Sequence, residues 1–110
     1  LIALADDSQA PGVFQAAADI DRSVPGDLSI LGFGNQDRHS AEALGLTTVE
    51  WPLKDMTEAA VASIINVIEG RSPMTNVHPS ASLEDEAPDG TPIATIPTRP
   101  VWRSSVARRG

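Results

Sequence analysis

The stretch that decides the fold covers residues 1–33 and has the sequence LIALADDSQAPGVFQAAADIDRSVPGDLSILGF. Its first five residues form an apolar run of strand length, and residues 28–33 form a second one. Between them, residues 9–22 carry apolar groups at helical spacing, with Pro11 in the first turn, where a missing N–H costs little. A proline–glycine pair at 25–26 then forces a turn. The stretch therefore predicts a strand, a helix and a second strand parallel to the first, joined by a right-handed crossover.

Two further elements are expected after this unit. Residues 34–45 form a loop with a short helical turn at 40–44, and residues 46–49 form a β-branched strand. Pro52 then opens a helix from the first-turn position, and Gly70 ends it. The expected apolar face of this helix consists of residues at helical spacing: Leu53, Met56, Ala60, Ile64, Val67 and Ile68.

Residues 72–92 differ in composition from the rest of the chain. They contain four prolines, four acidic residues and neither Lys nor Arg. Such a segment buries too little apolar area to offset the entropy of ordering it, so we expect a mobile acidic loop. Short extended pieces are expected at 93–96 and 101–103, in edge or irregular positions because of the neighbouring prolines. The whole pattern indicates the α/β class with mostly parallel strands.

Composition and charge exclude several classes of protein. The 110 residues suffice for one domain, and the absence of cysteine excludes disulfide frameworks, thiolate metal ligands and cysteine nucleophiles. The formal charge is −7, and an acidic chain is by itself a poor nucleic-acid binder. No apolar run approaches the roughly 18 residues that span a bilayer. Because the chain opens on an apolar run without methionine or a basic region, we expect no signal peptide and a fragment of something longer.

Three polar or aromatic residues are candidates for ligand binding. Asp6 and Asn35 each follow a predicted strand, and ligands of open α/β sheets bind outside the carboxyl ends of the strands. Asp6 could accept hydrogen bonds from a ligand or cap the following helix, and Asn35 suits either a sugar or an ordinary turn. Trp51 lies between the last predicted strand and the long helix, where it could stack on a sugar face or fill the core.

Other chemistry is expected to be absent. The Gly32–Gly34 pair lacks the third glycine of a dinucleotide site, and no nucleophile elbow is present. An acid–base pair of Asp6 and Glu50 has nothing to fix its separation. His39 and His78 lie far apart in sequence and are interpreted as surface residues, so we expect no metal, no cofactor and no enzymatic activity.

The order of these features is typical of one family. The motifs that carry the resemblance are Val-Pro-Gly-Asp-Leu-Ser-Ile-Leu-Gly-Phe at 24–33, Leu-Thr-Thr-Val at 46–49 and Ile-Pro-Thr-Arg-Pro-Val-Trp-Arg-Ser-Ser at 96–105. With the run at 3–13, they resemble the C-terminal half of the effector-binding region of the lactose-repressor (LacI/GalR) family of bacterial transcription regulators. The resemblance covers nearly the whole chain except 72–92.

The resemblance implies a periplasmic-binding-protein-like fold, in which two α/β subdomains close on a small effector that is often a sugar. It implies a cytoplasmic regulator whose DNA-reading headpiece lies outside this sequence. The helix over 53–70 would belong to the other subdomain, which leaves its apolar face without a partner here. The implied effector-binding residues are Asp6, Asn35, Trp51 and Leu53. The implied homodimer interface combines the first helix with residues 41–46, through Pro11, Phe14, Gln15, Leu44 and Leu46.

Some positions depart from the family pattern. Gly34 stands where the family usually has an aspartate that binds ligand hydroxyls, and Trp51 stands where a glutamine is common. Two other functions stay open at this point. One is a solute-binding module of a transport system, and the other is a stand-alone module that dimerises with full-length regulators.

Overall fold

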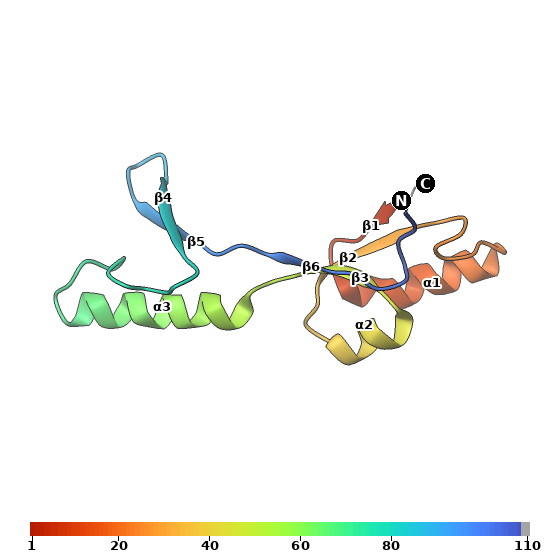
Figure 1. Ribbon diagram of the computed structural model, residues 1–110, viewed down its shortest axis with the longest axis horizontal. Coiled ribbons are helices and arrows are strands. Elements are labelled where there is room, and N and C mark those ends of the chain that lie inside the picture. The colour runs from red at the N-terminus through yellow and green to blue at the C-terminus, as the bar shows by residue number, and fades with distance from the viewer. Residues whose placement is uncertain (109–110) are drawn as a thin grey trace. The chain divides into compact units, whose positions relative to one another are not determined.

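The computed structural model describes residues 1–108, which form two compact units (Figure 1). Unit 1 comprises Leu1–Trp51 and the described residues from Thr98 onward, and unit 2 comprises Pro52–Pro97. The elements in chain order are β1 (Ile2–Ala3), the 3-10 helix η1 (Asp7–Gln9), α1 (Ala10–Asp19), β2 (Ile30–Gly34), α2 (Arg38–Leu44), β3 (Thr47–Glu50), α3 (Leu53–Ile68), β4 (Ser82–Glu86), β5 (Pro92–Thr95) and β6 (Arg99–Val101).

The sheet of unit 1 has the strand order β1-β2-β3-β6. β1 pairs with β2 in parallel, with Ile2 opposite Ile30, and β2 pairs with β3 in parallel. The predicted strand–helix–strand unit is therefore confirmed, as is the mostly parallel α/β class. β6 runs antiparallel to β3 and places Arg99 opposite Glu50. β6, which follows unit 2 in the chain, thus forms an edge strand of the unit 1 sheet.

The core of unit 1 lies between the sheet and its two helices. Ala10, Ile30, Ala41 and Leu46 are buried together, with exposed fractions of 0–2%. α1 enters this core through η1, whose N-cap is Asp6: its side chain accepts a hydrogen bond from the Ser8 N–H, and Gln9 completes a capping box. The cap is therefore Asp6. The neighbouring Asp7 carboxylate contacts β2 and β3 instead, as described below.

The residues after β6 fasten unit 1 through Ser105, which is 2% exposed. Its hydroxyl accepts from the Thr47 N–H (2.8 Å) and donates to the Ile30 carbonyl (2.6 Å). Its backbone N–H donates to the carbonyl of Gly45, the left-handed residue that ends α2. A serine from the end of the chain therefore satisfies backbone groups of β2 and β3 that would otherwise be buried without partners.

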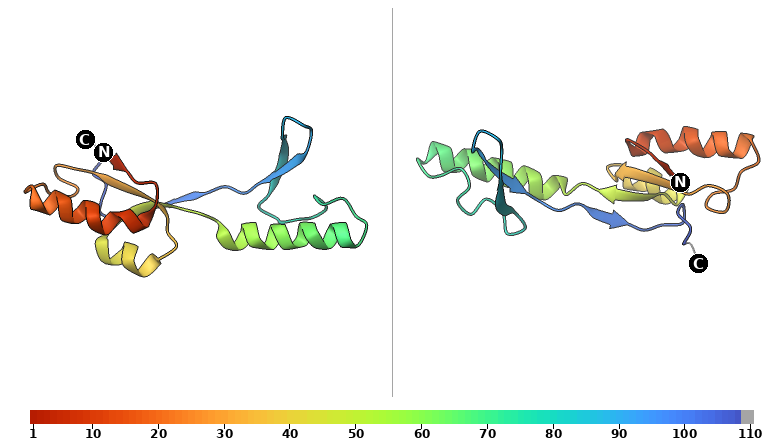
Figure 2. Two further views of the ribbon diagram at one scale, coloured as in Figure 1. Left: turned by 180° about the vertical axis from the view of Figure 1, so that it is seen from behind. Right: turned by 90° about the horizontal axis from the view of Figure 1, so that it is seen from above.

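Unit 2 consists of α3, a loop and the β4–β5 hairpin. The loop is held to α3 by Asn66, whose side-chain amide donates to the carbonyls of Pro73 (3.3 Å) and Thr75 (2.7 Å). Val77, 6% exposed, is buried beside it. β4 lies inside the segment 72–92, where we expected a loop without regular structure, and it pairs antiparallel with β5. Backbone bonds of this hairpin stabilise a segment that has few apolar side chains to bury (Figure 2).

α3 has large apolar side chains that face solvent in the structure. The exposed ones are Leu53, Met56, Val61, Ile64, Ile65, Val67 and Ile68. The buried residues of α3 are Ala59 and Asn66, so the loop covers a narrow stripe of small and polar groups. The residues expected to form the apolar face of this helix are thus exposed in this chain. None of the helices within residues 1–108 has the length and apolar character needed to cross a membrane.

Candidate functional site

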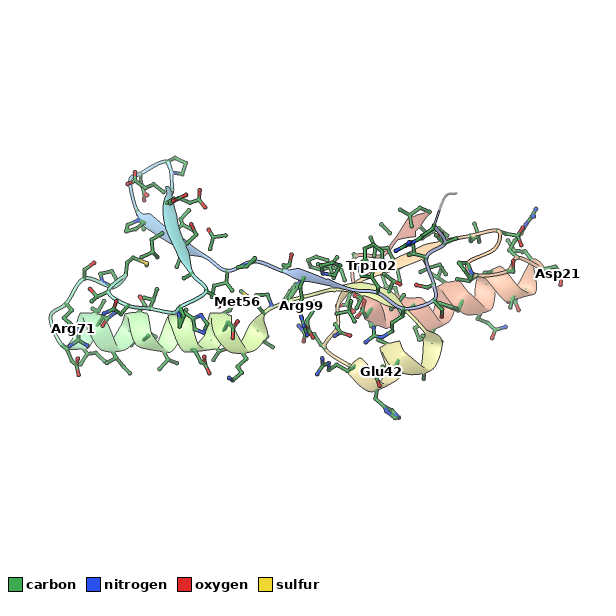
Figure 3. All side chains as sticks on the ribbon, viewed as in Figure 1. Asp21, Glu42, Met56, Arg71, Arg99 and Trp102 are labelled. Atoms are coloured by element: carbon green, nitrogen blue, oxygen red, sulfur yellow. The ribbon has the colours of Figure 1, made fainter. Side chains whose placement is uncertain are left out.

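The carboxyl ends of β1, β2 and β3 meet at one edge of the unit 1 sheet, which we call the carboxyl edge. Asp6 and Asp7 follow β1, Asn35 follows β2, and Trp51 follows β3. Because β6 is antiparallel, its first residue, Arg99, lies at the same edge, as labelled in Figure 3. The topology thus gathers polar residues that are up to 93 positions apart in the chain.

Asp7 is the structural pin of this edge. One carboxylate oxygen accepts from the Asn35 N–H (2.8 Å), and the other accepts from the Thr48 hydroxyl (2.7 Å). The carboxylate needs Gly32 beside it, because a Cβ atom there would lie 2.1 Å from Asp7 Oδ1. Asp7 therefore ties the loop after β1 to β2 and β3, and its two oxygens are occupied within the protein.

Glu50 is the centre of a charge network that the sequence did not single out as a binding feature. Its carboxylate accepts from the Asn35 side-chain amide (2.8 Å) and from Arg99 Nε, and Arg38 lies 3.6 Å away. The hydrogen bond from Arg99, followed by that from Asn35, holds the pKa of Glu50 below its ordinary value. The pKa of Asp6 is also lowered, chiefly by hydrogen bonding to Ser8. A general acid at neutral pH needs a raised pKa, so these lowered pKa values do not favour the acid–base pair considered from the sequence.

Asn35 is 4% exposed and adopts a left-handed backbone conformation with φ of 52°. Its amide nitrogen donates to Glu50, and its amide oxygen accepts from Arg103 Nη2 (3.1 Å). One amide N–H and one oxygen lone pair remain for another partner. The structure thus places Asn35 at the carboxyl edge as predicted, with half of its hydrogen-bonding capacity used internally.

The other predicted effector-binding residues differ in their surroundings. Asp6 is exposed, and Trp51 is 41% exposed with its ring edge-to-face against Phe33 at a centroid distance of 5.6 Å. Trp51 therefore packs on the sheet and still offers aromatic surface to solvent. Leu53, half exposed, belongs to unit 2. Unit 1 thus brings together Asp6, Asn35 and Trp51 at one edge, and it does not contain Leu53.

A hollow of unit 1 lies beside the start of α1 and α2 and has a volume of about 300 Å³. Its lining residues are Asp6, Asp7, Ser8, Pro11, Gln36, Asp37, Ser40, Ala41, Leu44 and Leu46. Among the residues predicted for a dimer interface, Pro11 and Gln15 are exposed, whereas Phe14 and Leu44 are half-buried against the core. Leu46 is completely buried, so the expectation that it faces a partner is wrong: it is a core residue at the floor of this hollow.

The comparisons with known proteins agree with this architecture. The model of the periplasmic binding protein-like domain matches residues 1–106. The chain belongs to this family. Among solved structures, it is similar to a transcriptional regulator of the LacI family from Burkhoderia phymatum, with 28% identity and a TM-score of 0.61 over 98% of this chain. None of the curated proteins compared with the chain matches it.

Family membership confirms the resemblance inferred from the motifs, namely to the effector-binding domain of LacI/GalR regulators. The match covers 34% of that regulator's chain, so this sequence spans about a third of that protein's length. Both findings connect the fold to regulatory ligand-binding domains. The carboxyl edge of unit 1 is therefore the candidate effector site.

Proposed function

We propose that this chain is the effector-binding and dimerisation portion of a LacI/GalR-type transcription regulator, and that it senses a small sugar-like molecule. The observation that carries the proposal is the carboxyl edge of unit 1 in a family of binding domains. Asp6 and Asn35 supply hydrogen-bonding groups there, and Trp51 supplies an exposed aromatic face. Sugars offer hydroxyl groups and apolar ring faces, which match these two kinds of contact.

The proposed mechanism is a shift between two conformations of the regulator. The effector stabilises whichever conformation it binds more tightly, and a headpiece outside this sequence changes its affinity for DNA accordingly. Gly34 supplies no carboxylate to the site, so the exposed carboxylate of Asp6 takes a larger part in binding hydroxyl groups. The acidic body of the chain does not itself contact DNA, and the regulator acts in the cytoplasm, where the DNA is.

Dimerisation is proposed through the surface around the 300 Å³ hollow. Pro11 and Gln15 on α1 are exposed, and Leu44 on α2 lines the hollow, so two short helices offer one continuous surface. A homodimer uses the same patch on both copies, which requires such a patch to be self-complementary. Sedimentation of the natural polypeptide tests this step. A dimer that Pro11→Asp converts to a monomer supports the interface, and an unchanged dimer contradicts it.

The effector site is tested by substituting Trp51 and Asp6, with the other tryptophan, Trp102, as the control. Trp51→Ala and Asp6→Ala are each expected to weaken binding by at least about 1 kcal/mol, in the range of one lost interaction with a buried ligand. Trp102→Ala is the matched control, because Trp102 is 71% exposed and lies outside the carboxyl edge. The measurement is calorimetric titration of the natural polypeptide with a panel of neutral and phosphorylated mono- and disaccharides. Unchanged affinity in both site variants would exclude this site.

A further inference from the structure

Three metal-ligating side chains meet on unit 2, away from the proposed effector site. Asp55 and Glu58 lie on α3, and His78 comes from the loop that follows this helix. His78 Nε2 is 3.2 Å from Glu58 Oε2 and 3.7 Å from Asp55 Oδ1, and the three ligand atoms all lie within 4.8 Å of one another. The side chain of His78 is 12% exposed. This histidine is therefore not the free surface residue that we expected from the sequence.

The fold places these residues together in a defined way. Asp55 and Glu58 are three residues apart, which puts them on the same face of α3. The loop is fastened to the same helix by the side-chain amide of Asn66 and by the buried Val77, which directly precedes His78. The position of His78 over α3 is thus set by its neighbours in the loop as well as by its own contacts.

We propose that Asp55, Glu58 and His78 bind a divalent transition-metal ion of the zinc class, which fastens the loop to the first turns of α3. Zinc ligands lie about 2.0–2.2 Å from the ion, which places two ligands of a tetrahedral site roughly 3.3–3.5 Å apart. The two measured distances from His78 Nε2, 3.2 and 3.7 Å, lie on either side of that range. One imidazole nitrogen with two carboxylate oxygens favours zinc over magnesium or calcium, which prefer oxygen ligands alone.

The charges around the cluster fit a cation. Lys54 pairs with Glu58 through Oε1 (3.2 Å), so Oε2, the oxygen that faces His78, is left for the metal.

Metal binding requires one local change at His78. The Ser80 N–H donates to His78 Nδ1 (3.1 Å), which places the ring proton on Nε2. When Nε2 binds the ion, that proton moves to Nδ1 and the hydrogen bond from Ser80 is given up for the metal–nitrogen bond. No proton is gained or lost overall, and the exposed turn at Ser80 can reorient because its side chain makes no buried contact.

The experiment is calorimetric titration of the untagged full chain with Zn²⁺ and, separately, with Mg²⁺. We expect one Zn²⁺ per chain with micromolar or tighter affinity and no comparable heat with Mg²⁺. His78→Gln and Asp55→Asn should each weaken Zn²⁺ binding by at least about tenfold, since losing even an indirect partner of a metal ligand costs that much. His39→Gln is the matched control, because His39 is the other histidine and is exposed on α2. Zn²⁺ binding that is absent, or that is equal in His78→Gln and the wild type, would overturn the site.

Hydrogen exchange tests the fastening of the loop independently of affinity. Zn²⁺ should slow exchange of the backbone amides of Val77, His78 and Ala81 in the wild type and in His39→Gln, and it should leave these rates unchanged in His78→Gln. Circular dichroism confirms that each variant keeps its helices. Slowing that persists in a folded His78→Gln variant would show that the ion acts elsewhere, which contradicts the proposal.

Discussion

The two units bury different kinds of side chain. Unit 1 buries Ile30 and Leu46 completely and satisfies buried polar groups with pins such as Asp7 and Ser105. Unit 2, in contrast, buries only Ala59, Asn66 and Val77 among its described residues, while most large apolar groups of α3 face solvent. Unit 1 therefore has an internal core of its own. The exposed face of α3 indicates that unit 2 reaches its full stability when a further apolar surface covers it, as in a longer chain or an assembly.

Among changes to the polar contacts of unit 1, the largest effect is expected from crowding Asp7. Gly32→Ala would place a Cβ atom 2.1 Å from Asp7 Oδ1 and 2.9 Å from Leu46 Cδ2, so we expect a loss of about 3 kcal/mol in the free energy of unfolding. The measurement is urea denaturation followed by circular dichroism. Gly12→Ala is the control: it meets nothing within 4 Å on α1, and it should stabilise the chain by up to about 1 kcal/mol. Equal effects of the two variants would contradict the claim that the Asp7 carboxylate needs the space beside Gly32.

A smaller loss is expected when the serine that fastens the end of unit 1 is removed. Ser105→Ala leaves the Thr47 N–H and the Ile30 carbonyl without their side-chain partner, which should cost about 2 kcal/mol. The neighbouring Ser104→Ala tests the comparison, because Ser104 is exposed and its hydroxyl makes a long bond of 3.4 Å to the Gly45 carbonyl. In thermal unfolding, the Tm of Ser105→Ala should be well below the Tm of Ser104→Ala. A larger loss at Ser104 would show that the fastening lies elsewhere.

The charge network at the carboxyl edge should make unit 1 sensitive to acid. The pKa of Glu50 is lower in the folded state than in the unfolded state, where it is about 4.5, because Arg99 and Asn35 donate to its carboxylate. Its stabilising contribution is therefore complete above that unfolded value and is lost as pH falls through the folded value. Glu50→Gln should cost about 1 kcal/mol at pH 7 and flatten the fall in stability below pH 5. Glu42→Gln, on the exposed side of α2, should leave the pH profile unchanged.

The smallest effect on stability is expected on the exposed apolar face of α3 in unit 2. Ile64→Ser on α3 should change the stability of the 110-residue chain by less than about 0.5 kcal/mol, because Ile64 is 61% exposed. The same change at the fully buried Ile30 should cost more than about 3 kcal/mol. Denaturation of both variants compares the two units directly. A large loss at Ile64 would mean that its side chain is covered in solution by a second copy.

Local patterns in the sequence were sufficient for most elements. The apolar runs that became β1, β2 and β3 and the periodicity of α1 and α3 express contacts with the nearest layer, so they are visible within short windows. The extended piece expected at 93–96 overlaps β5, but β4 and its pairing with β5 were not predicted, even though Asp89-Gly90 is a turn signal between the two strands. The acidic composition of that segment favours a loop. Backbone pairing between strands, however, does not require apolar side chains.

The site was harder to predict because its partners are distant in sequence. Asp6, Asn35 and Trp51 could be placed at the carboxyl edge from strand order alone. The pairing of Glu50 with Arg99 could not be predicted in this way. Arg99 lies 49 positions away and reaches Glu50 because β6 runs antiparallel to β3. His78 is likewise 20 positions from Glu58, and a loop of irregular backbone brings it back to α3. Pairings of this kind depend on the course of the loops, which periodicity does not reveal.

The insertion of unit 2 between β3 and β6 has a consequence for the order of folding. β1, β2 and β3 are synthesised before unit 2, and the whole of Pro52–Pro97 must follow before β6 and Ser105 become available. Until then, β3 has an open edge, and the Thr47 N–H lacks the hydroxyl that later accepts its hydrogen bond. Completing unit 1 therefore closes a long loop, a slow and entropically costly step. β6 and Ser105 therefore complete a sheet whose other strands precede unit 2 in the chain.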